Sequence, residues 1–339
     1  MLISGFKKLN IKDEEDIFWR HFQSLLDKKF FYNCKYTRYN IQFFKTLCKE
    51  KFNIIEDKSF LLLDDKGVFF AFIGSEIENE KGENQISCFG MPSITLELDE
   101  LSISQEKYIK KEIDDLICNL KNKLILIDFY NRSKLSISFN HIIFNYQSKL
   151  NYNYSRFIDL NPDIKKLKST VRKSYKSLIN LGEREMDIKI YSHKNIDIEV
   201  IDRFRSLHIR EAGRETRTRD SWINQYHSIL HNQAFVVTAD IKEELVSSGF
   251  FFIGRSHCFY ASSASRRDLF EKPLFHALLW KAIEYAKTCG VIVFETGAQY
   301  PKFMDKKITQ KEFSIAKFKS GFGGSSKLNI ILDLDKSII

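Results

Sequence analysis

The sequence predicts an α/β fold in which one order of strands and helices occurs twice. Three extended apolar stretches, an amphipathic helix and a short strand follow one another between residues 60 and 130. Three strands, a helix and a strand recur in that order between residues 235 and 295. This arrangement favours central sheets flanked by helices. The two halves share no visible sequence similarity, so the repeat is one of architecture.

The first half begins with helical, aromatic sequence between residues 11 and 51, where FWRHFQSLL forms the clearest apolar stripe. The turn Asp64–Gly67 favours a hairpin between the first two strands. Ser104 is a suitable cap for the helix. The expected strands and helix of this half are Phe60–Leu63, Val68–Ile73, Ile86–Leu98, the helix Gln105–Leu120, and Leu124–Tyr130.

The second half begins near Leu160, where Asn161, Pro162 and Asp163 interrupt the pattern. We therefore expect an N-terminal domain at residues 1–160 and a C-terminal domain at residues 161–339, with the N-terminal domain in a supporting role. The expected elements of the main repeat are Phe235–Ala239, Leu245–Ile253, His257–Ala261, a helix Leu274–Lys287 opened by Pro273, and Val291–Glu295. A short helix, Phe313–Lys319, and a last strand, Lys327–Leu334, follow.

Composition and charge limit the class of protein. The chain has 339 residues, 43% hydrophobic residues and a net charge of +9, which fits either a solvated surface or an anionic partner. The six cysteines show no metal spacing and are too sparse for a disulfide framework, which favours a reducing, cytoplasmic location. We expect no signal peptide, no membrane span and no metal dependence.

A cationic stripe marks the beginning of the second half. Apolar residues recur every three or four positions in a predicted helix Asp163–Leu181, and no acidic residue occurs between Ile164 and Gly182. Repeated like charges disfavour a helix by about 0.2–0.5 kcal/mol per pair. The stripe is either a solvated face or a phosphate-binding face; its basic residues are Lys165, Lys168, Arg172 and Lys176.

The stretch from Val291 to Gly324 is the strongest candidate for a site. A buried strand ends near Glu295, and in open α/β sheets ligands collect at the carboxyl ends of strands. A short helix then leads to a glycine-rich exit that carries Lys319. A charged segment from Tyr300 to Lys311 separates the two.

Five motifs of the second half occur in the order of a known family. They are VRKSYKSLINLGER (171–184), FYASSAS (259–265), PLFHALLWKAIEYAKTCG (273–290), FETG (294–297) and IAKFKSGFGG (315–324). With these motifs the chain resembles the FemABX-like branch of the GNAT acyltransferase superfamily. The resemblance implies tandem GNAT-like domains, each a mixed central sheet flanked by helices, and transfer of an acyl or aminoacyl group to an amine.

The resemblance implies that Lys319 lies near the reacting carbonyl, where an ammonium stabilises a developing oxyanion. Glu295 is a candidate acceptor of the amine's proton, or a strand-end carboxylate paired with an arginine. His276 is a candidate base or donor contact, or a core-edge histidine. Tyr260 is a core residue or a proton donor to the leaving group. Gly321, Gly323 and Gly324 let the backbone approach a ligand, or end a helix.

The loop before the main helix differs from that of acetyl-CoA-dependent GNAT enzymes. In those enzymes a glycine-rich loop holds the pyrophosphate, whereas Ser263–Pro273 contains no glycine. Arg266 and Arg267 are candidates to hold phosphate by their side chains instead. The helical arm of some tRNA-dependent members is not evident, which favours an acyl-CoA thioester donor, with aminoacyl-tRNA as the alternative.

An arginine-rich segment, Arg205–Trp222, is expected to cover the acceptor site, with Gly213 as a break between two helices. Its candidate acceptor-binding residues are Arg214, Arg217 and Trp222, and the alternative is a solvated loop with internal salt bridges. We therefore expect an N-acyltransferase that acts on a nucleotide-linked or acidic amino sugar for bacterial surface glycan biosynthesis. The alternatives are an aminoacyl-tRNA-dependent peptidoglycan cross-bridge enzyme and a non-catalytic binder of nucleic acid or anionic surfaces, for which Arg172 and Lys176 are candidate contacts.

Overall fold

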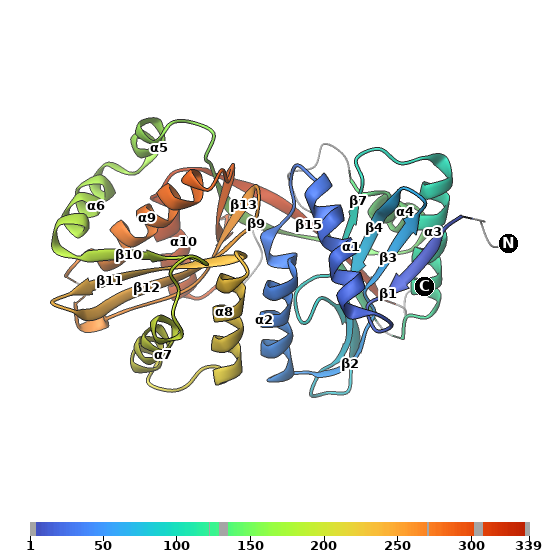
Figure 1. Cartoon of the computed structure of the whole chain (residues 1–339), viewed down its shortest axis with the longest axis horizontal. Helices are drawn as coiled ribbons and strands as arrows, with labels where there is room; N and C mark the ends of the chain where they lie inside the picture. The colour runs from blue at the N-terminus through green and yellow to red at the C-terminus, as the bar shows by residue number, and fades with distance from the viewer. Residues whose placement is uncertain (1–4, 122, 129–134, 270, 302–307, 336–339) are drawn as a thin grey trace. The chain divides into compact units, whose positions relative to one another are not determined.

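The computed structural model describes residues 5–121, 123–128, 135–269, 271–301 and 308–335. The chain divides into two compact units, described here one at a time (Figure 1). The first contains Met1–Phe30, Leu47–Asn153 and Leu328–Ile339, and the second contains Phe31–Thr46 and Tyr154–Lys327. Neither compact unit is continuous in sequence, so the units do not test the expected domain boundary at residue 160, which stays a prediction.

The first unit has an antiparallel sheet and a mixed group of strands. The antiparallel sheet has the order β1 (Lys7–Asn10), β3 (Phe60–Asp64), β4 (Gly67–Ile73) and β7 (Ile94–Glu97). The mixed group has the order β15 (Ser325–Asp335), β8 (Lys123–Asp128), β6 (Asn84–Ser87), β5 (Ser75–Glu78) and β2 (Asn53–Asp57), with β6 and β8 parallel. Helices α1 (Glu15–Lys28), α3 (Ile103–Cys118) and α4 (Ile137–Asn145) belong to this unit. Buried Phe, Leu and Ile side chains of β3, β4, α3 and β8 form its core.

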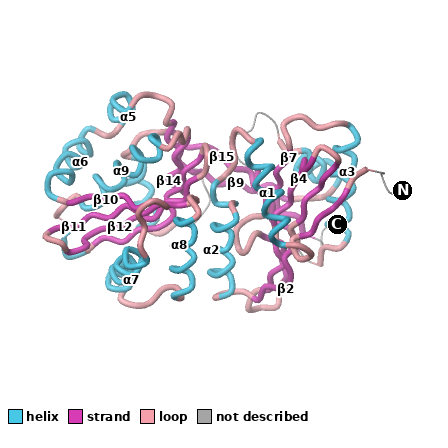
Figure 2. Tube along the Cα trace, viewed as in Figure 1, coloured by secondary structure: helices cyan, strands magenta, loops and turns pink. Residues whose placement is uncertain are grey.

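The second unit is a mixed sheet between two layers of helices (Figure 2). Its strands have the order β10 (Asp187–Tyr191), β11 (Ala234–Ile241), β12 (Glu244–Ile253), β13 (His257–Ser265), β14 (Val293–Gln299) and β9 (Lys149–Asp159). Helices α6 (Lys173–Glu185) and α9 (Leu274–Thr288) pack on one face, and α7 (Ile198–Ala212) and α8 (Arg219–Leu230) on the other. The shorter elements of this unit among the described residues are η1 (Cys34–Tyr36), α5 (Ile164–Thr170), η2 (Arg267–Leu269) and α10 (Gln310–Ser320). Helix α2 (Arg38–Lys49) begins in this unit.

The predicted α/β class and the predicted repeat of element order are confirmed. Strands β3, β4 and β7, helix α3 and strand β8 correspond in order to β11, β12, β13, α9 and β14, with β5 and β6 inserted in the first repeat. The single strand expected at Ile86–Leu98 is wrong, because a turn between Cys88 and Met91 separates β6 from β7. The strand that follows each repeat in sequence lies mainly in the other unit: β9, which follows the first repeat, pairs with β14, and β15, which follows the second, pairs with β8. This exchange explains why the compact units do not follow a single cut in the sequence.

Several predicted boundaries change. The single helix Asp163–Leu181 is wrong: extended backbone at Val171 separates α5 from α6, and Arg172 donates its N–H to Gly321 O instead of continuing the helix. Ser102 rather than Ser104 caps α3, through a capping box with Gln105. The last two residues of the predicted strand Leu124–Tyr130 lie outside the described residues, as does part of the segment between Tyr300 and Lys311.

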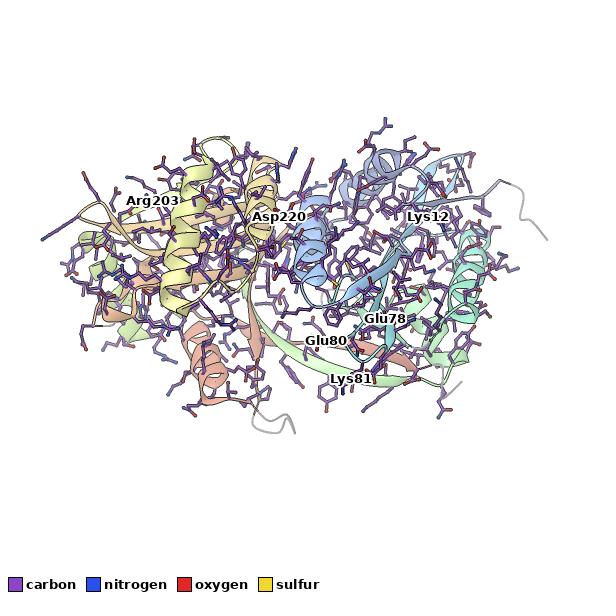
Figure 3. All side chains as sticks on the ribbon, turned by 90° about the horizontal axis from the view of Figure 1, so that it is seen from below. Lys12, Glu78, Glu80, Lys81, Arg203 and Asp220 are labelled. Carbon is purple, nitrogen blue, oxygen red and sulfur yellow. The ribbon has the colours of Figure 1, made fainter. Side chains whose placement is uncertain are left out.

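Other local predictions are confirmed. The turn Asp64–Gly67 joins β3 to β4, Pro273 precedes α9, and Gly213 ends α7 with a left-handed conformation. In the side-chain view, Arg203 marks α7 and Asp220 the start of α8 (Figure 3). None of the helices among the described residues combines the length and hydropathy that a membrane-spanning segment needs.

Candidate active site

The parallel strands β13 and β14 pair at their beginnings and then separate. Their ladder joins His257 to Val293, Cys258 to Phe294 and Phe259 to Glu295, and it includes no later pair among the described residues. Directly beyond it each strand has a bulge, at residues 260–262 of β13 and 295–297 of β14. Beyond Phe259 and Glu295 the two strands therefore no longer pair with each other, and a ligand can approach the backbone there.

Lys319 reaches this point from α10. A Cβ atom built on Gly297 would lie 3.1 Å from Lys319 Nζ, and Nζ lies 4.8 Å from the centroid of the Tyr260 ring. Gly297 has a φ of +95°, so both space and backbone conformation favour glycine. Burial lowers the pKa of Lys319 to about 8, although the charge of Glu295 opposes this shift. The lysine is thus a partly desolvated cation beside the separating strands.

Glu295 is a buried carboxylate with cationic and polar neighbours. Its side chain is 3% exposed, and Oε2 lies 3.2 Å from His257 Nε2 and 3.8 Å from Lys35 Nζ. Burial raises the pKa of Glu295, but Lys35, His257 and Ser155 outweigh it and lower the value to about 2. A carboxylate with so low a pKa is a weak proton acceptor near pH 7.

Three residues of this cluster were not identified from the sequence. Lys35 comes from η1, and its Nζ also lies 4.4 Å from the Phe259 ring centroid. His257 Nδ1 accepts the backbone N–H of Cys34 at 3.3 Å and lies 3.2 Å from Cys34 Sγ. Because Nδ1 is an acceptor, the neutral ring carries its proton on Nε2, which faces Glu295. More than 220 positions separate Cys34 from His257, and no local pattern connects them.

Tyr260 and His276 lie in different surroundings. The Tyr260 hydroxyl is 2.5 Å from Ser263 Oγ, and burial raises the pKa of Tyr260 to about 12. His276 packs edge-on against Tyr175 and Phe318, at ring distances of 4.6 and 5.1 Å. Burial lowers its pKa to about 4, so the ring is neutral near pH 7. These contacts give His276 a packing role, and its catalytic role stays a prediction.

The glycines after Lys319 allow close packing of the chain on itself. A Cβ atom on Gly321 would lie 2.1 Å from the Tyr175 ring, and one on Gly324 would lie 2.2 Å from Phe157 O. Gly323 has a φ of +89° and lies against Thr170. The turn therefore joins the end of α10 to the start of α6, which explains these glycines without a ligand.

Arg266 and Arg267 already face acidic side chains. The Arg266 guanidinium pairs with Asp268 and Glu244, both at 2.5 Å. The Arg267 N–H donates to Glu211 Oε2 at 3.0 Å. The Glu211 carboxylate thus accepts a hydrogen bond from a backbone N–H of the loop before α9. Phosphate binding by these arginines stays a prediction.

The predicted acceptor-binding residues are divided between the core and the surface. Trp222 is 1% exposed and packs edge-on against Phe204, with ring centroids 5.1 Å apart. The Arg217 guanidinium stacks 3.6 Å from the Trp222 ring centroid. Arg214 is exposed in the turn after α7. The structure therefore brings Arg217 and Trp222 together, and their role in binding an acceptor stays a prediction.

Comparisons with known proteins define the class of fold. No family model matches the chain, and no curated protein matches its sequence significantly. Solved structures do match, and they confirm the predicted α/β fold as one that is similar to the fold of FemX. FemX superposes with a TM-score of 0.66 at 10% identity, over 97% of each chain. A conserved protein of unknown function from Bacteroides thetaiotaomicron gives 0.60 at 11% identity, over 98% of this chain and 99% of that one. L-PGS from Bacillus licheniformis gives 0.58 at 10% identity, over 93% and 91%. At these identities the likeness concerns the fold alone.

Proposed function

We propose that the chain is an acyltransferase that moves an aminoacyl group from an activated ester, such as aminoacyl-tRNA, to an amino group of a cell-envelope precursor. The observation that carries the proposal is the desolvated Lys319 ammonium beside the separating strands β13 and β14. The FemX-like fold supports it, because the FemABX-like resemblance implies this chemistry.

The reaction needs stabilisation of negative charge. The acceptor amine attacks the ester carbonyl, a C–N bond forms, and the carbonyl oxygen becomes an oxyanion. The C–O bond to the nucleic acid then breaks, and the leaving oxygen takes up the proton that the amine loses. The Lys319 ammonium donates a hydrogen bond to the oxyanion, an interaction that is strong in a partly desolvated site.

Glu295 supports this role as a counter-charge. Its negative charge raises the pKa of Lys319 against the effect of burial, so most Lys319 side chains are protonated near pH 7. His257 and Lys35 in turn keep Glu295 ionised. This division of roles replaces the hypothesis that Glu295 removes the proton of the amine.

An ester donor fits the loop before α9 better than coenzyme A. The Arg267 N–H and the Arg266 guanidinium already bind Glu211, Asp268 and Glu244. A pyrophosphate at this loop would have to compete with these carboxylates. The thioester donor and the amino-sugar acceptor predicted from the sequence remain candidates for the same assay.

The test is a transfer assay with the full chain. Radiolabelled aminoacyl-tRNA pools and labelled acetyl-CoA are offered separately, with peptidoglycan precursors and amino sugars as acceptors. We expect label to move from aminoacyl-tRNA to a peptidoglycan precursor, and Lys319→Met to abolish the transfer. Transfer from acetyl-CoA alone would reject the ester donor, and no transfer from either donor would reject the function.

A further inference from the structure

Helices α5 and α6 carry an unpaired basic surface. Its residues are Lys165, Lys166, Lys168, Arg172, Lys173 and Lys176, and we call them the basic helix surface. No acidic residue occurs between residues 164 and 182, and none of the six forms an ion pair with any described residue. Lys165, Lys166, Arg172 and Lys173 are exposed. Lys168 and Lys176 donate hydrogen bonds to the neutral oxygens of Asn180 and Ser169, and Lys168 Nζ also lies 5.8 Å from the Trp280 ring centroid.

This surface begins beside the turn that follows Lys319. The Arg172 N–H donates to Gly321 O at 2.8 Å, and Gly321 is two residues beyond Lys319. The guanidinium of Arg172 lies 5.0 Å from the Tyr175 ring centroid, and this ring covers Gly321. The glycine turn therefore attaches the basic helices to the helix that carries the candidate catalytic lysine.

The surface is suited to a polyanion rather than to a lipid bilayer. The apolar residues Leu167, Val171 and Ile179 are buried, and none of the exposed large hydrophobic residues of the described chain lies on α5 or α6. Interfacial helices insert an apolar face into the membrane, and these helices have none available. Phosphodiester backbones, by contrast, are bound chiefly by basic and polar groups, and this contact needs no inserted apolar face.

We propose that the basic helix surface binds the phosphate backbone of an RNA donor and directs its aminoacylated end to Lys319. This inference rests on the proposed function, because it names the part of the chain that recognises the donor. Helix α6 spans about 20 Å, enough for several phosphates. Contact with about four to six phosphates gives a slope of log K against log salt of about −3 to −5.

The test compares two triple variants of equal net charge. One is Lys165→Gln/Lys166→Gln/Lys173→Gln, and the control is Lys81→Gln/Lys107→Gln/Lys194→Gln, at exposed lysines outside the surface (Lys81 is labelled in Figure 3). Uncharged tRNA is titrated at several salt concentrations. We expect the first variant to lose at least tenfold in affinity and about two to three units of salt slope, and the control to change less than threefold.

Equal losses in both variants would overturn the inference, as would loss of binding to anionic vesicles with tRNA binding intact. A second assay uses a short aminoacylated oligonucleotide that cannot span the surface. We expect the first variant to keep transfer from this donor and lose it from full-length tRNA. If the wild type binds tRNA through this surface but transfers no aminoacyl group, the proposed function is rejected and RNA binding by the basic helix surface is retained. If the wild type transfers the aminoacyl group and the variant keeps its tRNA affinity, the inference about the basic helix surface is rejected and the proposed function is retained.

Discussion

Lys35 Nζ and Glu295 Oε2 lie 3.8 Å apart in a part of the second unit where the carboxylate is almost fully buried. The lysine comes from the segment Phe31–Thr46, and the glutamate from the end of the β13–β14 ladder. A buried carboxylate stays ionised only when neighbouring cations and hydrogen-bond donors offset its desolvation. The pair therefore fixes a negative charge near Lys319.

Replacing Glu295 with Gln tests this counter-charge. Protonated Lys319 is the active form, so its deprotonation gives the wild-type kcat/KM an alkaline limb, on which kcat/KM falls as pH rises through about 8. Glu295→Gln removes a charge that raises the pKa of Lys319, so this alkaline limb moves to lower pH by about one unit. The measurement is kcat/KM between pH 6 and 10. An unmoved limb would contradict the counter-charge role, and complete loss of activity at every pH would restore the general-base hypothesis.

Tyr260 is expected to act through its ring. Lys319 Nζ lies 4.8 Å from the ring centroid, within the range of a cation–π contact. Tyr260→Phe keeps this contact and should leave kcat within about threefold, whereas Tyr260→Leu removes it and should lower kcat at least tenfold. If Tyr260→Phe instead lowered kcat by about a hundredfold, the hydroxyl would be a proton donor, which is one of the two roles that the sequence analysis left open.

The glycine turn is expected to be structural. Gly321→Ala brings a methyl group within 2.1 Å of the Tyr175 ring, so the ring and α6 must move. Overpacking of this kind costs about 1–3 kcal/mol of unfolding free energy. Chemical denaturation of Gly321→Ala measures the loss, with Ser326→Ala, an exposed position nearby, as the control. Full stability together with lost donor binding would instead indicate that Gly321 contacts a ligand.

Substitutions of Trp222 and Arg214 should differ in their effect on the stability of the protein. Trp222 is buried against Phe204, so Trp222→Ala should cost about 3–5 kcal/mol of unfolding free energy. Arg214 is exposed, and Arg214→Ala should change stability by less than about 0.5 kcal/mol. Urea titrations of the two variants make the comparison. A stable Trp222→Ala protein with a raised KM for the acceptor would show that the ring binds substrate.

The sequence predicted the repeat because periodicity and capping are local signals. Pro273 and the apolar stripe of α9 are visible without any knowledge of tertiary contacts. The break at Val171 was missed because its cause is a long-range hydrogen bond from Arg172 to Gly321. The exchange of β9 and β15 between units was missed for the same reason.

The candidate site was predicted only in part. Lys319, Glu295 and Tyr260 belong to motifs of the second half, and the structure brings them together around the separating strands. Lys35 and Cys34 come from the other end of the chain, and only tertiary packing reveals them. Trp222 illustrates the opposite limit, because a tryptophan in an arginine-rich segment gives no sign in the sequence that it is buried.

The most direct test compares Lys319→Met with Lys317→Met, two substitutions on α10. Lys317 is exposed, whereas Lys319 carries a charge that burial disfavours. Steady-state kcat for aminoacyl transfer and the free energy of unfolding are measured for both proteins at pH 7. We predict that Lys319→Met lowers kcat by about 10²–10³-fold without loss of stability, and that Lys317→Met changes kcat less than twofold. A Lys319→Met protein that keeps wild-type kcat would contradict the assignment of Lys319 as the catalytic cation.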